Sequence, residues 1–209
     1  QVSPTVLRDA ELQYEGEVHN VTLRASTPNY SEAFGLDVAR GNFYSATDYN
    51  GRTRVVVLGP DTVNALFPDD IDPLGEDIKI NGLSFRVIGI LESVGASSFG
   101  GSQDDVAIVP LTTAQERLFN NRSKRTGAFL VDAILMQAVD DAAIEGTIID
   151  ASEVLRQSHD INFRDEDDVQ ILTQQDFLDA FGSVTSVLTV FLGAIASISL
   201  LVGGIGIMN

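Results

Sequence analysis

The last thirty residues of the chain, Ala180–Asn209, contain no charged side chain. Within them, Val187–Asn209 is apolar or small almost throughout. Roughly 20 residues of helix cross a hydrocarbon core of ~30 Å, and helices in lipid use valine, isoleucine and glycine freely. The pattern therefore predicts a transmembrane helix over residues 187–209, with a domain in front of it at a membrane surface. The alternative is a core helix of a water-soluble protein, but such helices are usually shorter and carry a polar stripe.

Charge composition narrows the range of partners. The chain has 30 Asp and Glu against 13 Lys and Arg, giving a formal net charge of −17. Such a field repels nucleic acid, so neither DNA nor RNA is expected as a partner. No cysteine is present, which excludes disulfides, thiolate nucleophiles and cysteine-based metal sites. The opening segment, Gln1–Gly16, is polar and mixed in charge, so we expect any targeting element to lie upstream or to have been removed.

No catalytic, cofactor or metal site is predicted. The only histidines are His19 and His159, and they show neither an HExxH motif nor paired spacing, so neither a zinc site nor a serine triad is expected. The acidic runs at Asp69–Pro73 and Asp165–Asp168 leave Ca²⁺ open as an alternative, but they lack EF-hand spacing and are typical of solvated loops. The segment Gly95–Gly100 does not contain the GxSxG motif, and no GxxxxGK[ST] phosphate loop occurs anywhere.

Hydrophobic periodicity and turn residues divide the rest of the chain into strands and helices. The expected strands are 15–27, 36–39, 54–59, 76–80, 83–91, 105–109, 127–138 and 169–172. The expected helices are 28–34, 61–67, 112–120 and 140–159, with Asp61 and Thr112 as N-caps. Asn81-Gly82 predicts a tight hairpin turn, because both residues tolerate positive φ.

These elements predict an α+β fold made of two β-α-β units with an insertion between them. The expected arrangement is a split, ferredoxin-like, porter-type subdomain with an inserted smaller α/β subdomain, followed by a transmembrane helix. Residues 1–51 and 124–172 form the porter-like subdomain, and residues 52–123 form the insertion. Residues 173–186 form a stalk helix, which continues into the truncated transmembrane helix of residues 187–209. Rigid continuity at this junction would carry force from the domain to the membrane.

Several strings of residues are similar to those of a known family. They are TPNY (Thr27–Tyr30), ARGNFYSATD (Ala39–Asp48), RVVVLG (Arg54–Gly59), LFPDDIDPLGEDIKINGLSFRVIGIL (Leu66–Leu91), LRQSH (Leu155–His159) and LTVFLGAIASISLLVGGIGIMN (Leu188–Asn209). In these strings the chain resembles the permeases of MacB-type ABC transporters, a group that also includes the FtsX and LolC/LolE permeases. The resemblance extends from Val18 to Asn209.

The resemblance implies a role in transport rather than catalysis. The chain would be the extracytoplasmic part, residues 1 to about 180, of a permease in the cytoplasmic (inner) membrane, together with the start of its second transmembrane helix. ATP and magnesium would bind a separate nucleotide-binding domain or subunit, and its closure would drive substrate export or release by mechanotransmission. Implied partners are an ABC ATPase, a second permease in a homodimer or pair, the membrane, and, where an outer membrane exists, a periplasmic adaptor and an outer-membrane channel.

The residues expected to matter are therefore mechanical. The stalk residues are Thr173, Gln174, Asp176, Phe177 and Phe181. The small residues expected at helix contacts in the membrane are Gly193, Ala194, Ala196, Ser197, Gly203, Gly204 and Gly206. The loop expected to contact a partner or substrate contains Gly95, Ser97, Ser98, Phe99 and Gly100. Gly203–Gly206 could alternatively be a flexible point, since glycine weakens a helix.

The alternative function is a membrane-anchored extracytoplasmic binding or adhesion module with no ATPase partner. It would share the anchor but would have no reason to reproduce the family's transmembrane string.

Overall fold

The computed structural model describes residues 1–68, 71–95, 102–124, 126–138, 140–159, 161 and 169–208. The chain forms two compact units, Gln1–Ala138 and Val139–Asn209, and each is described by itself. The acidic run Asp165–Asp168 lies outside the described residues, as does most of the predicted contact loop.

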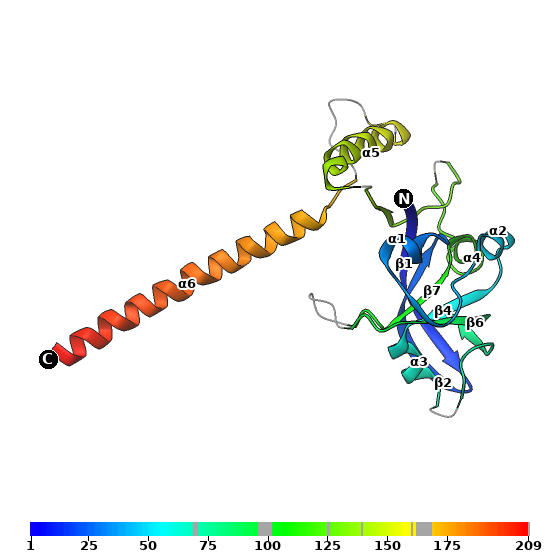
Figure 1. Cartoon of the computed structure of the whole chain (residues 1–209), viewed down its shortest axis with the longest axis horizontal. Coiled ribbons are helices and arrows are strands. Elements are labelled where there is room, and N and C mark those ends of the chain that lie inside the picture. Colours follow the sequence, from blue (N-terminus) through cyan, green and yellow to red (C-terminus); the bar gives the residue numbers. More distant parts are fainter. Residues whose placement is uncertain are drawn as a thin grey trace. The chain divides into compact units, whose positions relative to one another are not determined.

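Eight strands and six α-helices account for the regular structure of the described residues (Figure 1). The strands are β1 (Val2–Tyr14), β2 (Glu17–Ser26), β3 (Val38–Gly41), β4 (Val55–Leu58), β5 (Asp77–Ile80), β6 (Leu83–Leu91), β7 (Val106–Pro110) and β8 (Ala133–Met136). The helices are α1 (Tyr30–Phe34), α2 (Ala46–Gly51), α3 (Pro60–Leu66), α4 (Leu111–Arg117), α5 (Ile144–Ser158) and α6 (Gln174–Met208). A short 3₁₀ turn, Asp141–Ala143, precedes α5.

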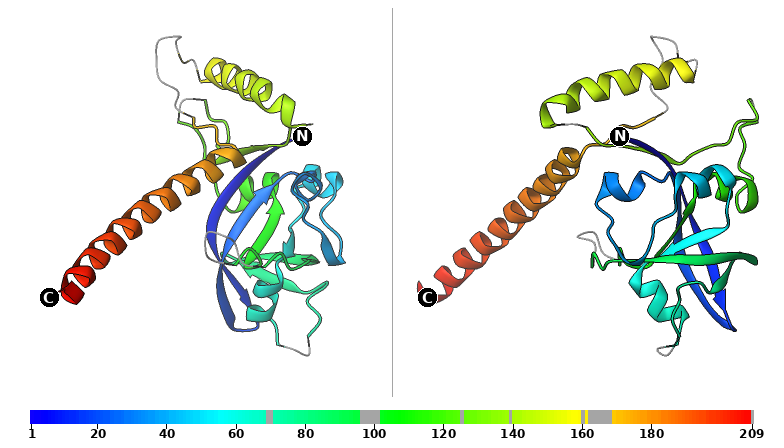
Figure 2. Two further views of the ribbon diagram at one scale, coloured as in Figure 1. Left: turned by 60° about the vertical axis from the view of Figure 1, so that its left-hand side comes forward. Right: turned by 45° about the vertical axis from the view of Figure 1, so that its right-hand side comes forward.

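Six strands of the first unit close on themselves (Figure 2). The order is β2-β7-β4-β6-β5-β1, and β1 pairs back onto β2. Pairs β2–β7 and β4–β6 are parallel, and the other four pairs are antiparallel. Strand β3 is added on β6, and β8 is added on β1. Closure pairs the backbone groups that a sheet edge would leave open, so the ring is a small barrel.

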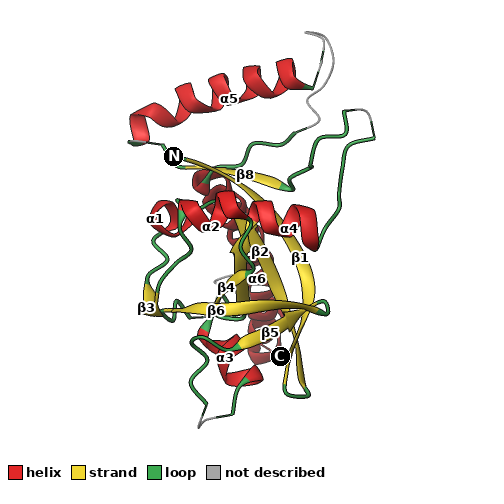
Figure 3. Cartoon of the chain, turned by 90° about the vertical axis from the view of Figure 1, so that its right-hand side faces the viewer, coloured by secondary structure: helices red, strands yellow, loops and turns green. Residues whose placement is uncertain are grey.

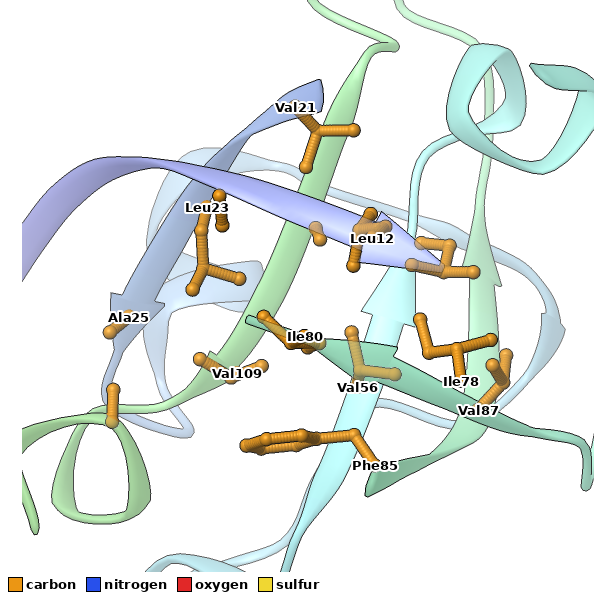
Figure 4. Packing of buried hydrophobic residues seen from close by; sticks show 14 of the residues in the cluster. Leu12, Val21, Leu23, Ala25, Val56, Ile78, Ile80, Phe85, Val87 and Val109 are labelled. Carbon is orange, nitrogen blue, oxygen red and sulfur yellow. The ribbon is translucent and has the colours of Figure 1, made fainter. Parts of the chain in front are cut away.

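Apolar side chains fill the barrel interior, and a second cluster covers part of its outside. Figure 4 shows interior residues from β1, β2, β4, β5, β6 and β7, among them Leu12, Leu23, Val56, Ile78, Ile80, Phe85, Val87 and Val109. The outer cluster consists of Tyr30, Tyr44, Val55, Val57, Leu91, Val106 and Ile108. Strands β4 and β7 are thus buried on both faces, which is why they read as continuous apolar runs instead of alternating ones.

Most elements predicted from periodicity are present. Strands β5 and β6 form the predicted hairpin, and both Asn81 and Gly82 have positive φ (48° and 83°). Helix α1 ends before Gly35, whose φ is 61°, as expected for the helix predicted over residues 28–34, but it begins at Tyr30 with Asn29 as N-cap and not at Pro28. Helix α5 has Ile144, Ile148 and Leu155 on its half-buried side.

The first strand is the main element that periodicity missed. Val2–Tyr14 looked like a polar opening segment, yet it forms the longest strand of the barrel and pairs with β2 from Val6↔Ala25 to Tyr14↔Glu17. Its inward face carries Val6, Ala10, Leu12 and Tyr14 but is interrupted by Arg8, and its other face has the exposed Leu7 among polar residues. Helix α2 was also missed, although Ser45 and Asp48 form a capping box at its start.

Two predicted helix caps are wrong. Helix α3 begins at Pro60 with Gly59 as N-cap, because proline lacks the N–H that a cap would satisfy. Asp61 instead accepts a hydrogen bond from the Ser102 hydroxyl. Helix α4 begins one residue before Thr112, whose hydroxyl donates to the Tyr49 carbonyl.

The predicted second β-α-β unit is only partly present among the described residues. Of the strand expected at 127–138, the structure retains β8, and residues 169–172 form no strand. The subdomain limits at residues 52 and 123 stay a prediction. In the structure, strands from residues 55–110 close the barrel together with β1 and β2, and the chain divides between Ala138 and Val139.

The barrel interior predicts a large difference between two leucines of β1. Leu12 is fully buried, whereas Leu7 is 39% exposed. Leu12→Ala should lower the free energy of unfolding by about 2–5 kcal/mol, because it leaves a cavity in the interior. Leu7→Ala is the matched control on the same strand and should cost less than about 1 kcal/mol. Urea unfolding of the full chain measures both; equal losses would show that β1 does not line a packed interior.

Candidate functional site

The predicted stalk begins with a well-formed helix cap. The Asp176 backbone N–H donates to the Thr173 hydroxyl oxygen at 3.2 Å. In return, the Thr173 N–H and hydroxyl both donate to the Asp176 carboxylate at 2.7 Å. These hydrogen bonds, from the hydroxyl first and the amide second, lower the pKa of Asp176. The two side chains form a capping box with aspartate at N3, so α6 starts at a defined residue.

Helix α6 continues without interruption through the predicted stalk and membrane segments. It spans 35 residues from Gln174 to Met208 (Figure 1). Phe177 and Phe181 lie in its early turns, and Phe181 is 46% exposed. Among the described residues, the candidate membrane span within it is Leu178–Ser197, which has a mean hydropathy of 1.7 and of which none is buried. This stretch begins inside the predicted stalk, so the limit at residue 187 stays a prediction.

Polar side chains in this stretch find partners within the helix itself. The hydroxyls of Ser183, Thr189 and Ser197 donate to the carbonyls four residues earlier, at 3.0, 2.8 and 2.8 Å. In lipid no water is present to satisfy such groups, so internal pairing is what a membrane helix requires.

The predicted small residues lie along this same helix. A Cβ built on Gly193 meets no heavy atom within 4 Å, and Ala194 and Ala196 are exposed. Gly203, Gly204 and Gly206 lie within the helical backbone of α6, so the chain stays helical through them. An open helix surface of this kind leaves room for close approach of another helix.

Only one residue of the predicted contact loop is described, and it belongs to the loop's base. Gly95 has φ 90°, and its N–H donates to the Asp104 carboxylate at 3.1 Å. The Val94 N–H donates to the same carboxylate at 2.8 Å, and so does the Ser93 hydroxyl. Ser97, Ser98, Phe99 and Gly100 lie outside the described residues.

Asp104 was not predicted and is the main polar residue of this region. It is only 5% exposed. The Ser93 hydroxyl, followed by the Val94 and Gly95 amides, lowers its pKa even though burial opposes ionisation. A Cβ on Gly59 would lie 2.0 Å from the Asp104 carbonyl oxygen, so glycine is needed where this segment crosses the start of α3. The sequence signals that could have indicated this contact were Ser93 before the glycine-rich loop and Asp104 after it.

The adjacent carboxylate, Asp105, joins other elements. It lies 2.8 Å from His19 Nε2 on β2 and accepts a hydrogen bond from the Thr62 hydroxyl on α3 at 3.0 Å. His19 therefore has a structural partner. Among the described residues, no group of three or more His, Asp or Glu is arranged to hold a metal ion.

A small hollow lies beside these carboxylates. Its volume is about 160 Å³, below the roughly 300–1,000 Å³ typical of sites for drug-sized ligands. It is lined by Thr22, Arg24, Leu36, Pro60, Leu91, Glu92, Val94, Ser102, Gln103, Asp104, Asp105 and Val106. This hollow is therefore smaller than a typical site for such ligands.

Asp104 provides a pH-dependent test of the loop base. Its pKa is lower in the folded state, so its stabilising contribution is complete above the pKa of an unfolded aspartate and is lost as the pH falls through the lowered value. Asp104→Asn should lower the free energy of unfolding near neutral pH by about 1.5–3 kcal/mol, because hydrogen bonds to a charged group are lost. The mutant should also lose less stability on acidification than the wild type.

The control is Asp9→Asn, at an exposed carboxylate of β1. Urea unfolding at neutral and acidic pH compares the three chains. An Asp104→Asn protein with wild-type stability and wild-type pH dependence would show that the carboxylate does not hold the loop base.

The family model and the similar proteins that match this chain all point to the same family. The family model of the MacB-like periplasmic core domain matches residues 1–152. The chain is 35% identical over 198 residues to the macrolide export ATP-binding/permease protein MacB of Azoarcus sp. strain BH72, covering 95% of the chain and 28% of that protein. It is 37% identical over 195 residues to the protein of the same name from Rhodospirillum rubrum, covering 93% and 28%. The chain thus spans less than a third of these relatives.

Two solved structures share the fold. One is the extracellular domain of the noncanonic ABC-type transporter YknZ from Gram-positive bacteria, with a TM-score of 0.65 and 20% identity, covering 78% of this chain and 77% of that one. The other is the periplasmic region of MacB from Actinobacillus actinomycetemcomitans, with a TM-score of 0.59 and 21% identity, covering 77% and 67%.

Proposed function

The chain belongs to the family of MacB-like periplasmic core domains, and on this premise we propose that it transmits an ATP-driven conformational change across the membrane to export or release a substrate. Its first unit would lie outside the cytoplasmic (inner) membrane and would move there. Residues 1 to about 180 would be extracytoplasmic. Helix α6 would carry the motion. The name of these relatives, macrolide export ATP-binding/permease protein, supports a transport role for the whole protein to which such a domain belongs.

The continuity of α6 is the observation that carries the proposal. A helix of 35 residues is roughly 50 Å long at 1.5 Å per residue. Its backbone hydrogen bonds resist stretching, and the capping box at Thr173 fixes where it begins. A displacement of the membrane end would therefore reach Thr173 without being absorbed by a break in the helix.

The small residues of α6 supply the second part of the mechanism. We propose that Gly193, Ala194, Ala196 and Ser197 face another transmembrane helix of the permease or of its pair. Gly203, Gly204 and Gly206 would continue this contact surface. Because small side chains let helix backbones approach closely, a shift of one helix would displace its neighbour.

ATP chemistry would lie outside this chain. The sequence has no phosphate loop of the GxxxxGK[ST] type, so ATP and magnesium would bind an ABC ATPase domain or subunit. A homodimer or permease pair would place two copies of the first unit next to each other. A periplasmic adaptor and an outer-membrane channel would join where an outer membrane exists. The loop containing Gly95 and Phe99 would contact one of these partners or the substrate.

The same proposal includes the finer architecture. We retain a split, ferredoxin-like, porter-type subdomain with an inserted smaller subdomain at residues 52–123. The pairing of β8 with the first residues of β1 supplies two adjacent strands for the porter-type layer. Helix α5, with apolar residues on one side, has the amphipathic character of a helix that packs on a sheet.

The membrane-anchored binding module is the less favoured function. The identity to the MacB relatives covers 93–95% of the chain, and so includes at least part of the transmembrane string as well as the outer domain. In a module that needs only an anchor, any sufficiently long apolar helix would serve, so similarity to the MacB sequence would not be expected there.

Replacing the stalk tests mechanical transmission. In the full-length permease, reconstituted in lipid with its ATPase, residues 173–181 are exchanged for a flexible Gly/Ser linker of equal length. The matched control exchanges the same residues for a helix-forming Ala/Glu/Lys sequence. The linker should leave ATP turnover within about twofold of wild type and abolish export or release, whereas the helical control should retain both. If the linker protein exports as well as the helical control, α6 is only an anchor.

A further inference from the structure

Positive charge is concentrated in one segment of this acidic chain. Residues 117–131 contain four Lys and Arg and no Asp or Glu. Residues 9–23, of the same length, contain four Asp and Glu and no Lys or Arg. We call residues 117–131 the basic loop, and its described cations are Arg117, Arg122 and Lys124. In a chain with a net charge of −17, this separation of charge requires a physical reason.

The basic loop has a defined structure. Arg122 and Phe129 form an antiparallel bridge, and the Ser123 N–H donates to the Ala128 carbonyl at 2.8 Å. The Arg122 guanidinium lies 3.6 Å from the centroid of the Phe129 ring and donates to the Gly127 carbonyl at 2.9 Å. The segment is thus a small hairpin stabilised by a cation–π contact.

The cations of the loop are not neutralised by the described part of the chain. Arg8, Arg40, Arg52 and Arg86 each pair with a carboxylate. Arg117, Arg122 and Lys124 are all exposed, and none of them pairs with a carboxylate of a described residue. Arg24, Arg54 and Lys79 also have no such pair, but those three lie apart in the sequence, whereas the loop cations fall within one short segment. Like charges held close together repel one another, so an anionic surface would stabilise this arrangement.

The loop lies at the end of the first unit where β1 begins and β8 ends. The Gln1 amino group donates to the Gln137 carbonyl, and the Gln137 N–H donates to the Gln1 carbonyl, both at 2.9 Å. The exit toward the second unit is therefore tied to the start of β1. Figures 1 and 3 show the segment between α4 and β8 at this N-terminal end of the unit and the β1–β2 turn at the opposite end. That turn carries Glu15 and Glu17.

We propose that the basic loop binds the anionic phospholipid headgroups of the membrane that holds α6. Arginine and lysine are the side chains that pair with phosphate, and an anionic membrane surface attracts basic segments near it. Leu130 is 43% exposed beside the cations, as expected for a segment that rests at a lipid interface. The same surface repels the acidic β1–β2 turn, so the contact orients the first unit. This inference rests on the membrane location of α6 and not on transport.

The test uses the chain held in lipid nanodiscs through α6. Because it has no cysteine, Ala128→Cys gives a single site for an environment-sensitive fluorophore in the exposed part of the loop. Nanodiscs of phosphatidylcholine are compared with nanodiscs that also contain phosphatidylglycerol, at low and high salt. A nitroxide on the lipid headgroup reports proximity by quenching.

Quenching should appear with phosphatidylglycerol, be absent with phosphatidylcholine alone, and fall as salt rises. Each basic side chain near an anionic surface contributes about fivefold to binding, so Arg117→Gln with Lys124→Gln should weaken it about twenty-fivefold. Arg122 is left unchanged in this pair because it stabilises the hairpin. Lys79→Gln, at an exposed lysine of β5 paired with Gln13 near the β1–β2 turn, is the matched control and should change nothing.

Equal quenching in both lipid mixtures, or no effect of the double substitution, would overturn the proposal. Protection of the fluorophore that requires a second copy of the chain, or a soluble acidic protein, would assign the loop to a protein contact and would also overturn it. Neither result bears on the stalk exchange, so the two proposals fail independently.

Discussion

Backbone pairing along β1 is the constraint on which the first unit depends. Its second half pairs with β2 and β5 and thereby closes the six-stranded barrel, while its first residues pair with β8. One continuous strand thus joins the barrel to the end where the chain enters and leaves the unit. Both clusters of buried apolar residues rely on this closure, because β4 and β7 can be buried on both faces only when the ring is complete. The basic loop and the segment that contains Asp104 both connect elements of the first unit, so their positions depend on the barrel.

Helix α6 must also satisfy its backbone hydrogen-bonding groups, but in lipid instead of water. Every backbone group in lipid must be satisfied internally, and a single uninterrupted helix achieves this. The hydroxyls of Ser183, Thr189 and Ser197 also donate to carbonyls within the helix, so these three groups need no water. A rigid barrel at one end of the chain and a continuous helix at the other are parts suited to moving without deforming. This is why the proposed function lies in the transfer of motion and not in a pocket.

Sequence patterns predicted the elements whose periodicity or turn chemistry is strong. The Asn81-Gly82 hairpin, the buried run at β4 and the long apolar helix were all visible, because positive φ, double burial and the lack of charge each leave a local mark. Strand β1 was missed because Arg8 interrupts its buried apolar face while Val2 and Leu7 lie exposed, so its sequence shows no regular alternation. The caps at Asp61 and Thr112 failed because Pro60 and Pro110 decide where those helices begin. Asp104 acts through contacts across a loop, which no local pattern encodes.

Direct observation of motion tests the central claim best. The chain has no cysteine, so Val18→Cys, at a 52% exposed position of β2, accepts one spin label on each of two paired permeases in lipid. Electron–electron distances are measured without nucleotide and with ATP trapped in the partner ATPase. Mechanical transmission predicts that the distribution of distances between the two labels shifts when the nucleotide-binding domains close. Closure of those domains with an unchanged distribution would contradict it.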